Sequence, residues 1–580
     1  MLNKVAGRFV TNVTFVCVFL SITLFVFDSR AQNWSTFGGQ SSRSGASKIT
    51  GPQNSTPLWG ATSPVSATIG MAVYTFGDQF VTSRTVFSPY TSVIECRNLQ
   101  NGTLVWTSPF ISNTSILYAI GFTEDAVYAH DYDSDSLYAL EPATGNIKWR
   151  SPHISLTFGA YPGCVFSCDG DVIVNGPIGS LRTTMRLDKD NGDTVWTNLE
   201  YIAIGPVVGL AANSSRVYRI TGGIFQPIVL TAIDMETGQS LYDSDPIPGD
   251  PDQENPITLG PENRIYFWRD GGNLYAFEDV GNGLFPIWSY APQTTTGTNF
   301  SGNISVAPDS TIYIFDQGFV KRLSHASGQV LNSSVVSINQ GSISIGADGT
   351  VYVNNQSAMY YAFTPDLQTI KWQYNIGSNV YNNMALAKDG IMVLTAAGGF
   401  IAALQTPYLS KPVADFKVSL RTAQVGQPID FFDQSSYFPS SWNWSFPGAT
   451  ITGASSQNPT GIVYNSAGIY EVELIVSNGF GSDSTTKKCY IEVVGTSGVF
   501  DEVQSDSKVF PNPSSGVVRL QTGLSVERDQ LIVQDISGRT VLFFNHESCD
   551  MTLDLSSLDK GMYLIRFGKN LNGVAKILLR

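Results

Sequence analysis

The pattern of hydrophobic and polar positions repeats along much of the chain. An apolar segment is followed by a polar turn that contains glycine, and then by a second segment that carries an aromatic residue. The clearest copy runs from Leu137 through Gly145 to Trp149. Alternating segments bounded by turn residues predict β-hairpins. Successive copies are separated by 43, 47, 46, 45 and 45 residues, counted between Gly102, Gly145, Gly192, Gly238, Gly283 and Gly328.

A second hairpin lies between successive copies. Turn residues such as Asp169-Gly170 and Asp348-Gly349 precede alternating strands such as Thr350–Val353. Asp-Gly turns tolerate the positive φ angles that two-residue hairpins need. Each unit of the repeat therefore holds four antiparallel strands, which is typical of one blade of a β-propeller.

An unpaired strand stands at each end of the repeats. Pro57-Leu58-Trp59 matches the outermost strand of a blade, and Phe400–Leu404 matches the strand that precedes it. Pairing these two strands closes the ring and removes exposed sheet edges. The pattern predicts an all-β fold with an eight-bladed β-propeller over residues 57–405, and a seven-bladed β-propeller is the alternative.

Two smaller β modules follow the repeats. After a linker at 406–411, residues 412–494 carry an alternating strand and predict an immunoglobulin-like β-sandwich, with Trp442 or Trp444 and Tyr470 in its core. After a second linker at 495–507, residues 508–580 alternate between apolar and polar positions around Asn-Pro and Ser-Gly turns. This pattern predicts a small C-terminal β-sandwich.

The N-terminus predicts export. Basic residues precede an apolar stretch over residues 10–27, and small residues then lead to Ala31. This is typical of a secretory signal peptide over residues 1–31, cleaved between Ala31 and Gln32, with an uncleaved anchor as the alternative. Residues 32–56 form a lead-in to the propeller. No later segment is apolar for long enough to span a membrane as a helix, so we expect no transmembrane helix in the mature chain.

Composition excludes some partners. Among 580 residues, the formal net charge is −14 and no long basic run occurs. Such an acidic surface repels phosphate groups, so we expect no nucleic-acid partner. Five cysteines follow the signal peptide, and an odd, scattered set predicts buried free thiols rather than a disulfide framework: Cys96, Cys164, Cys168, Cys489 and Cys549.

Local catalytic motifs are absent from the sequence. The four histidines form no metal-binding spacing, and we expect each of them at a turn or on the surface. Asp131, Asp133 and Asp135 have the opening spacing of a calcium loop, but Ser136 and Pro142 stand where that loop needs Gly and Glu. We therefore predict a solvated turn there. The sequence predicts no catalytic, cofactor-binding or metal-binding residue.

The repeats resemble the tryptophan-docking repeats of pyrroloquinoline-quinone (PQQ)-like propellers. That family includes quinoprotein dehydrogenases and non-catalytic scaffolds of outer-membrane assembly. The adjacent cysteines typical of the enzymes do not occur here, and their calcium ligands cannot be placed by motif, so we expect no cofactor. The resemblance implies that a tryptophan of each outermost strand packs against the neighbouring blade: Trp59, Trp106, Trp149, Trp196, Trp288 and Trp372.

The two C-terminal modules also resemble known families. Residues 412–494 resemble the PKD domain, although Pro447-Gly448 replaces its usual acidic turn. Residues 508–580 resemble the type A sorting domain of the type IX secretion system of Gram-negative bacteria. That resemblance implies the type IX machinery as a partner, and a secreted or cell-surface location outside the outer membrane. The matching motif positions are Phe510, Pro511, Asn512, Pro513, Gly561, Tyr563 and Lys576.

Three functions are compatible with this organisation. The leading hypothesis is a secreted or cell-surface, non-catalytic binding or adhesion protein, whose propeller is a platform for an unknown extracellular protein or glycan. The second is a secreted enzyme, either quinoprotein-like or acting on polysaccharides. The third is an envelope-assembly scaffold, and the sorting domain argues against it because a periplasmic scaffold needs no export across the outer membrane.

Overall fold

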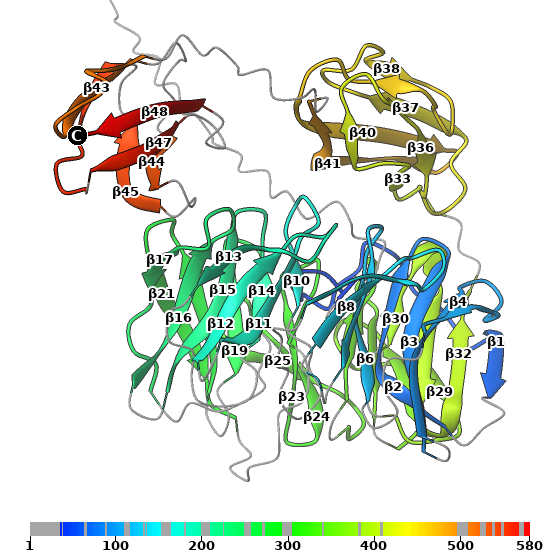
Figure 1. Ribbon diagram of the computed structural model, residues 1–580. Coiled ribbons are helices and arrows are strands. Elements are labelled where there is room, and N and C mark those ends of the chain that lie inside the picture. Colours follow the sequence, from blue (N-terminus) through cyan, green and yellow to red (C-terminus); the bar gives the residue numbers. More distant parts are fainter. Residues whose placement is uncertain are drawn as a thin grey trace, which may run out of the picture. The chain divides into compact units, whose positions relative to one another are not determined.

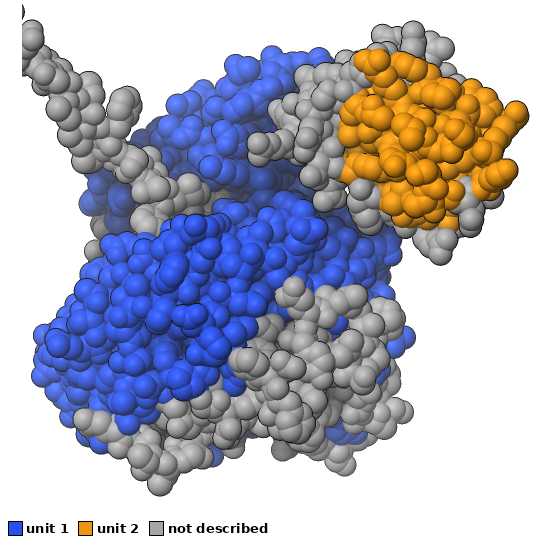
Figure 2. Space-filling model, turned by 90° about the vertical axis from the view of Figure 1, so that its left-hand side faces the viewer, with its two compact units in different colours: residues 1–494 blue, residues 495–580 orange. Residues whose placement is uncertain are grey.

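In the computed structural model, the described residues form strands almost throughout (Figure 1), with two short 3₁₀ turns at Lys388–Gly390 (η1) and Ala397–Gly399 (η2). The chain divides into two compact units, Met1–Val494 and Gly495–Arg580, which Figure 2 colours separately. The structure describes residues 35–36, 39–62, 67–87, 90–131, 134, 136–151, 164–178, 181–198, 209–223, 226–248, 257–268, 273–292, 304–338, 341–355, 357–380, 384–406, 410–495, 508–521, 529–535, 540–546, 550–558, 560–567 and 573–580, except 110–115.

Eight four-stranded antiparallel sheets lie between Pro57 and Leu404 in the described residues, and we number them sheets 1 to 8. Their strands, from the innermost outwards, are β2 (Ala67–Phe76), β3 (Gln79–Phe87), β4 (Tyr90–Asn98) and β5 (Leu104–Thr107) in sheet 1; β6 (Leu117–Phe122), β7 (Val127–Asp131), β8 (Ser136–Leu140) and β9 (Ile147–Ser151) in sheet 2; β10 (Val165–Phe166), β11 (Val172–Ile178), β12 (Leu181–Leu187) and β13 (Thr194–Asn198) in sheet 3; β14 (Leu210–Ala212), β15 (Arg216–Gly223), β16 (Gln226–Asp234) and β17 (Ser240–Asp243) in sheet 4; β18 (Thr258–Leu259), β19 (Arg264–Trp268), β20 (Leu274–Asp279) and β21 (Leu284–Tyr290) in sheet 5; β22 (Ser305–Val306), β23 (Ile312–Asp316), β24 (Phe319–Leu323) and β25 (Val330–Ser333) in sheet 6; β26 (Ile343–Ile345), β27 (Val351–Asn354), β28 (Met359–Phe363) and β29 (Ile370–Asn375) in sheet 7; and β30 (Ala385–Leu386), β31 (Met392–Ala396), β32 (Phe400–Leu404) and β1 (Pro57–Thr62) in sheet 8.

Burial changes from the inner to the outer strands of each sheet. Every residue of β7, β23 and β31 is buried, because both faces of these strands pack against neighbouring sheets. The outermost strands alternate instead. In β5, Leu104 and Val105 are 50% and 45% exposed, whereas Trp106 is 7% exposed. The single buried position of β5 is therefore the one that carries tryptophan.

The hydrophobic core is divided among the interfaces between sheets. One cluster joins Tyr128 and Trp149 of sheet 2 to Phe166 of sheet 3. Another joins sheets 7, 8 and 1. Strand β1 pairs antiparallel with β32, with Trp59 opposite Ala403, as the sequence predicts for ring closure. The circle of packed sheets is therefore closed by strands from the two ends of the repeat region.

The second module of unit 1 is an immunoglobulin-like sandwich. Trp444, rather than Trp442, fills its core at 1% exposure and lies 5.1 Å from the Phe416 ring. Tyr470 lies at the edge of this core, against Tyr464. The strands are β33 (Phe416–Val418), β34 (Thr422–Gln424), β35 (Pro428–Ile429), β36 (Phe431–Asp433), β37 (Ser441–Ser445), β38 (Gly453–Ala454), β39 (Ile462–Val463), β40 (Gly468–Asn478) and β41 (Gly481–Val494).

Unit 2 is a small β-sandwich, as predicted. Its two sheets have the strand orders β42-β43-β46 and β45-β44-β47-β48, and they enclose one core that includes Leu520, Val533 and Ile565. The strands are β42 (Lys508–Phe510), β43 (Val517–Gln521), β44 (Asp529–Asp535), β45 (Thr540–His546), β46 (Asp550–Asp554), β47 (Gly561–Phe567) and β48 (Gly573–Leu579).

Candidate functional site

The six tryptophans singled out in the sequence all lie on outermost strands and hydrogen-bond a segment beyond their own strand. Each indole nitrogen donates to a backbone carbonyl at 2.7–2.9 Å, and these bonds fix the packing of neighbouring parts of the ring. The donor and acceptor pairs are Trp59 and Leu99, Trp106 and Pro142, Trp149 and Lys189, Trp196 and Met235, Trp288 and His325, and Trp372 and Pro52.

Five of these indoles cover a glycine of the next sheet. A Cβ atom added to Gly145 would lie 2.3 Å from Trp106, and the φ angle of Gly145 is +73°. Glycine is therefore needed there both for the turn and for the close approach of the ring. The other four glycines that lie under an indole with positive φ are Gly102, Gly192, Gly238 and Gly328.

Sheet 4 docks differently because Tyr242 replaces the tryptophan. The Tyr242 hydroxyl donates a 2.7 Å hydrogen bond to the buried carboxylate of Asp279 in sheet 5. Tyr218 and Arg216 bind the same carboxylate. The matching turn glycine is Gly281, with φ +96° and no atom within 4 Å of an added Cβ. Gly283, which the repeat spacing predicts at this position, lies two residues later.

Two of the sorting-motif residues, Asn512 and Lys576, meet at one edge of unit 2. The Asn512 side chain donates to the Lys576 carbonyl at 2.8 Å and accepts from the Leu578 amide at 3.0 Å, which ties the segment after β42 to β48. Tyr563 is 8% exposed and belongs to the core, Gly561 begins β47, and the remaining motif residues, Phe510, Pro511 and Pro513, flank Asn512. Asn512 therefore links the two sheets of the sandwich at this edge.

Residues 39–50 and Ser35 line the inner edge of the propeller. Their carbonyls accept hydrogen bonds of 2.7–3.0 Å from amides at the ends of innermost strands: Ser35 from Phe122, Ser41 from Ala212, Ser42 from Leu259, Ser44 from Val306, Gly45 from Ile345 and Ile49 from Ala347. Arg43 is 1% exposed and donates to the Cys164 carbonyl at 3.2 Å. We call this segment the axial segment. It contacts sheets 2 to 7 in turn, so it fills one mouth of the propeller axis.

The immunoglobulin-like sandwich contacts that same end of the propeller. In each sheet, the turn between the innermost and second strands lies at one face of the ring, and antiparallel order puts the connection to the next sheet at the opposite face. We call these the junction face and the connection face. The sandwich contacts junction-face turns of sheets 8, 1, 2 and 3, at Asp389, Gly77, Asp125 and Cys168.

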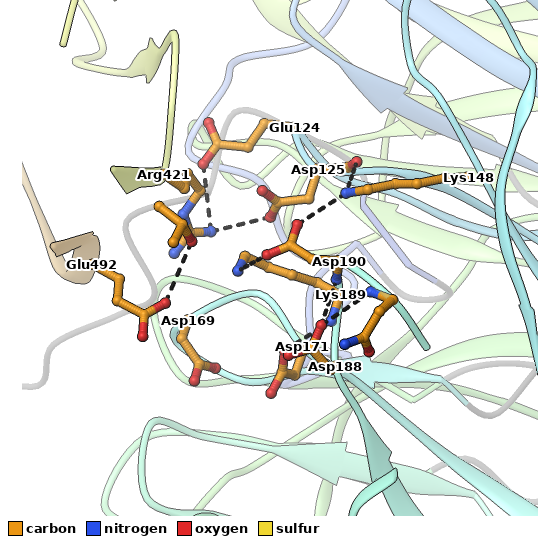
Figure 3. Close-up of polar contacts among 12 residues, drawn as sticks. Glu124, Asp125, Lys148, Asp169, Asp171, Asp188, Lys189, Asp190, Arg421 and Glu492 are labelled. Atoms are coloured by element: carbon orange, nitrogen blue, oxygen red, sulfur yellow. Dashed lines mark hydrogen bonds and ion pairs between the residues drawn. The ribbon is translucent and has the colours of Figure 1, made fainter. Parts of the chain in front are cut away.

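Arg421 is the centre of this junction. Its Nη1 lies 3.4 Å from a Glu124 oxygen and 3.2 Å from an Asp125 oxygen, and its side chain is 6% exposed. Burial alone disfavours the charged guanidinium, but the Asp125 and Glu124 carboxylates outweigh that cost and raise the pKa of Arg421. Figure 3 shows these contacts, with the Lys148–Asp190 ion pair beside them.

A second contact joins the sandwich to sheet 8 and the axial segment. The Tyr437 amide donates to the Asp389 carboxylate at 3.1 Å, and the Tyr437 hydroxyl donates to the Thr50 carbonyl at 3.0 Å. Ile49, Val413 and Tyr437 form a buried apolar cluster. The sandwich is therefore anchored to the residues that fill the axis, and sequence periodicity gives no signal for contacts between such distant segments.

Several residues singled out in the sequence belong to no functional site in the described structure or lie outside it. His130 is 1% exposed within β7, so the prediction of a turn or surface position is wrong for it, because both faces of β7 pack against neighbouring sheets. His325 does lie in a turn, hydrogen-bonded to Tyr266. The signal-cleavage pair Ala31 and Gln32, the acidic residues Asp133 and Asp135, and His153 lie outside the described residues.

No group of three or more histidine, cysteine or acidic side chains is arranged to hold a metal ion in the described ranges. The same ranges contain no helix that is long and apolar enough to cross a membrane.

Family models match three parts of the chain. Residues 91–317 match the model described as outer membrane protein assembly factor BamB, residues 415–491 match the PKD domain, and residues 508–579 match the secretion system C-terminal sorting domain. The chain thus combines a PQQ-like propeller, a PKD domain and a type IX sorting domain. The sorting domain indicates a secreted or cell-surface protein that interacts with the type IX secretion machinery.

Solved structures with a similar fold share little sequence with this chain. BamB from Moraxella catarrhalis is 15% identical, with a TM-score of 0.43, over 61% of this chain and 98% of its own. Quinohemoprotein alcohol dehydrogenase from Comamonas testosteroni is 13% identical, with a TM-score of 0.49, over 66% and 82%. A europium-containing methanol dehydrogenase is 11% identical, with a TM-score of 0.48, over 64% and 90%. No curated protein sequence matches the chain.

Proposed function

We propose that this chain is a non-catalytic binding protein of the cell exterior, of the adhesion type. The PQQ-like propeller and the PKD domain indicate an extracellular binding-type protein, and the sorting domain indicates export. In this proposal the propeller holds an extracellular protein or glycan on its connection face. The PKD domain anchors to the opposite, junction face.

The observation that carries this proposal is the axial segment. The carbonyls of Ser35 and of residues 41–49 accept hydrogen bonds from five innermost strands, and the Ser41 hydroxyl accepts one from β10, so this segment occupies one mouth of the propeller axis. Tyr437 of the PKD domain covers the end of that segment. A small-molecule cofactor at that mouth of the axis would compete with these contacts, whereas a macromolecule bound on the connection face would not.

The lengths of the segments between strands favour the connection face. The stretches from β9 to β10, from β17 to β18 and from β21 to β22 contain 13, 14 and 14 residues, whereas the turn from β22 to β23 contains five. Long connections carried by a rigid framework are where binding residues concentrate in proteins. The turns of the junction face are short, and the PKD domain contacts four of them.

The first test is binding of the purified full chain to arrays of glycans and of extracellular proteins. We expect saturable binding to a member of one of the arrays, and no absorbance change on titration with pyrroloquinoline quinone and Ca²⁺. Quinone-dependent absorbance together with turnover of an alcohol would overturn the non-catalytic assignment. Absence of any array ligand would count against adhesion.

The second test identifies which face of the propeller holds the ligand. A biotin-acceptor peptide is inserted beside Gln317, which follows β23, or beside Ser310, which precedes it; both residues lie in turns with positive φ. The two insertions stand at opposite ends of one strand, so they are matched. We expect bound streptavidin to block ligand binding at Gln317 and to leave it intact at Ser310. The reverse result would place the ligand on the junction face.

A further inference from the structure

Two half-buried thiols meet at the junction between the propeller and the PKD domain. Cys168 lies in the turn between β10 and β11, and Cys489 lies within β41. The two thiols are in hydrogen-bond contact. Cys96 and Cys164, by contrast, are fully buried inside the propeller. A pair that is 321 residues apart in sequence is therefore brought together by domain packing.

The backbone carbonyls of the two cysteines are held close together by one side chain. A single nitrogen of Arg421, Nη2, donates to the Cys168 carbonyl at 3.2 Å and to the Cys489 carbonyl at 3.3 Å. The two carbonyl oxygens are therefore at most about 6.5 Å apart. A disulfide needs Cα atoms about 4.4–6.8 Å apart. The same guanidinium is held by Glu124 and Asp125 of the propeller, so the separation is fixed by buried ion pairs.

The chain bulges to present Cys489. In the β40–β41 ladder, Tyr470 pairs with Ile491 and Val472 pairs with Lys487, so one residue of β40 faces three residues of β41. Cys489 is in the middle of those three and has a φ angle of +51°. Bulges redirect side chains out of the regular alternation of a strand. A positive φ is uncommon for cysteine and costs energy, so the junction must hold this conformation in place.

We propose that Cys168 and Cys489 form a disulfide that covalently joins the propeller to the PKD domain once the chain leaves the cytoplasm. The proposal rests on the contact between the two thiols, the shared Arg421 bonds and the bulge. It needs only the export that the sorting domain indicates, and it does not depend on any ligand of the propeller. Disulfides form and persist in such oxidising compartments.

The two cysteines would have different roles in the thiol–disulfide exchange that forms this bond. The hydrogen bond from Cys168 lowers the pKa of the Cys489 thiol to about 7, and the same contact raises the pKa of Cys168. Arg421 also favours the Cys489 thiolate, whereas burial, Asp169 and Glu236 oppose it. Cys489 is therefore the attacking thiolate and Cys168 is the resolving thiol.

The oxidant is an external disulfide, either oxidised glutathione or the disulfide of a thiol oxidase. The Cys489 thiolate attacks one of its sulfurs, a mixed disulfide forms, and one thiolate of the oxidant leaves. Cys168 then loses its proton and attacks the Cys489 sulfur, which releases the second thiolate. Two electrons and two protons pass from the chain to the oxidant, so the oxidant ends as two thiols.

The test uses the full chain with a protease recognition sequence inserted in the linker at 406–411. The chain is purified from the medium, cleaved, and run on a denaturing gel with and without dithiothreitol. We expect the two fragments to stay joined without reductant and to separate with it. Cys168→Ser and Cys489→Ser should each separate under both conditions, whereas the control Cys549→Ser should behave like the parent chain.

Peptide mapping of the parent chain keeps the test independent of variant folding. We expect one cross-linked peptide pair, containing Cys168 and Cys489, with two hydrogen atoms fewer than the reduced peptides. Fragments that separate without reductant, from exported and folded protein, would refute the disulfide. A cross-link from either cysteine to Cys549 would also refute it. A loss of ligand binding alone would bear on the proposed function and not on this inference.

Discussion

Replacing the glycine beneath a docked tryptophan is the sharpest test of how the propeller is held together. Gly145 lies under Trp106, and an added Cβ would be 2.3 Å from one ring carbon and 2.8 Å from two others. Carbon atoms pack at about 3.5–4.0 Å, so in Gly145→Ala the indole must move by more than about 1 Å. The ring is 7% exposed and has little space in which to move.

The expected loss of stability has three parts. Holding alanine at the Gly145 φ of +73° costs about 1–2 kcal/mol. Forcing extra volume into a packed site costs about 1–3 kcal/mol. Displacing the ring weakens its 2.8 Å hydrogen bond to the Pro142 carbonyl, worth about 1 kcal/mol. The sum is about 3–6 kcal/mol, which for a propeller of this size lowers the Tm by roughly 4–8 °C.

Gly281→Ala is the matched control. Gly281 occupies the equivalent turn of sheet 5 with φ +96°, but nothing lies within 4 Å of an added Cβ, because Tyr242 docks there through Asp279. Gly281→Ala should therefore lose only the backbone contribution of about 1–2 kcal/mol, which lowers the Tm by about 1–3 °C. Differential scanning calorimetry of the purified chains measures both changes.

A double variant separates docking from other causes. In a Trp106→Ala background the indole is already absent, so adding Gly145→Ala should cost only the backbone part, and the two substitutions should be non-additive. Equal Tm losses for Gly145→Ala and Gly281→Ala, or additive losses in the double variant, would refute the conclusion that indole packing makes glycine necessary at this turn.

Three further predictions concern the junction, the thiols and the sorting domain. Arg421→Met should leave two largely buried carboxylates without their cation, at a cost of about 3–5 kcal/mol. Limited proteolysis between the propeller and the PKD domain should therefore become faster, whereas Lys417→Met, at an exposed position, should change nothing. In the reduced chain, the rate of iodoacetamide labelling of Cys489 should rise with pH through about 7 and then level off, because the Cys489 thiol is fully ionised above that pH. Burial raises the pKa of Cys164 to about 11, so mass spectrometry should find Cys164 unlabelled. Asn512→Asp keeps the oxygen that accepts a hydrogen bond from β48 but loses the 2.8 Å hydrogen bond that Asn512 donates. Cell fractionation should therefore find the variant accumulated in the periplasm. Unchanged export would show that this bond is dispensable.

Local sequence patterns predicted the elements that repeat. The copy of the repeat that ends at Trp149 and the hairpin at Asp348-Gly349 predict strands correctly, because each hairpin is built from residues that are neighbours in the sequence. Ring closure through Pro57–Thr62 and Phe400–Leu404 followed from counting unpaired strands, and the pairing of β1 with β32 confirms it. The resemblance of residues 412–494 and 508–580 to known families likewise predicted the PKD and sorting modules that the family models match.

Contacts outside the repeat were not predictable in the same way. The axial segment has no strand pattern of its own, since its backbone hydrogen bonds go to five different sheets and its side chains bond a sixth. Arg421 and Glu124 are ordinary charged residues in the sequence, and nothing in their spacing relates one to the other. Cys168 and Cys489 looked like members of a scattered set, because a pair formed by domain packing leaves no local spacing to recognise.

All the features that the sequence did not predict lie on the junction face of the propeller. The axial segment fills the axis there, Arg421 and Tyr437 attach the PKD domain there, and Cys168 faces Cys489 there. Buried ion pairs alone are a weak way to hold two domains together, because desolvation offsets much of their attraction. A disulfide across the same contact does not depend on salt or pH, which an exported protein cannot control. In our proposal, a junction fixed in this way leaves the connection face, with its longest segments between strands, as the surface for the ligand.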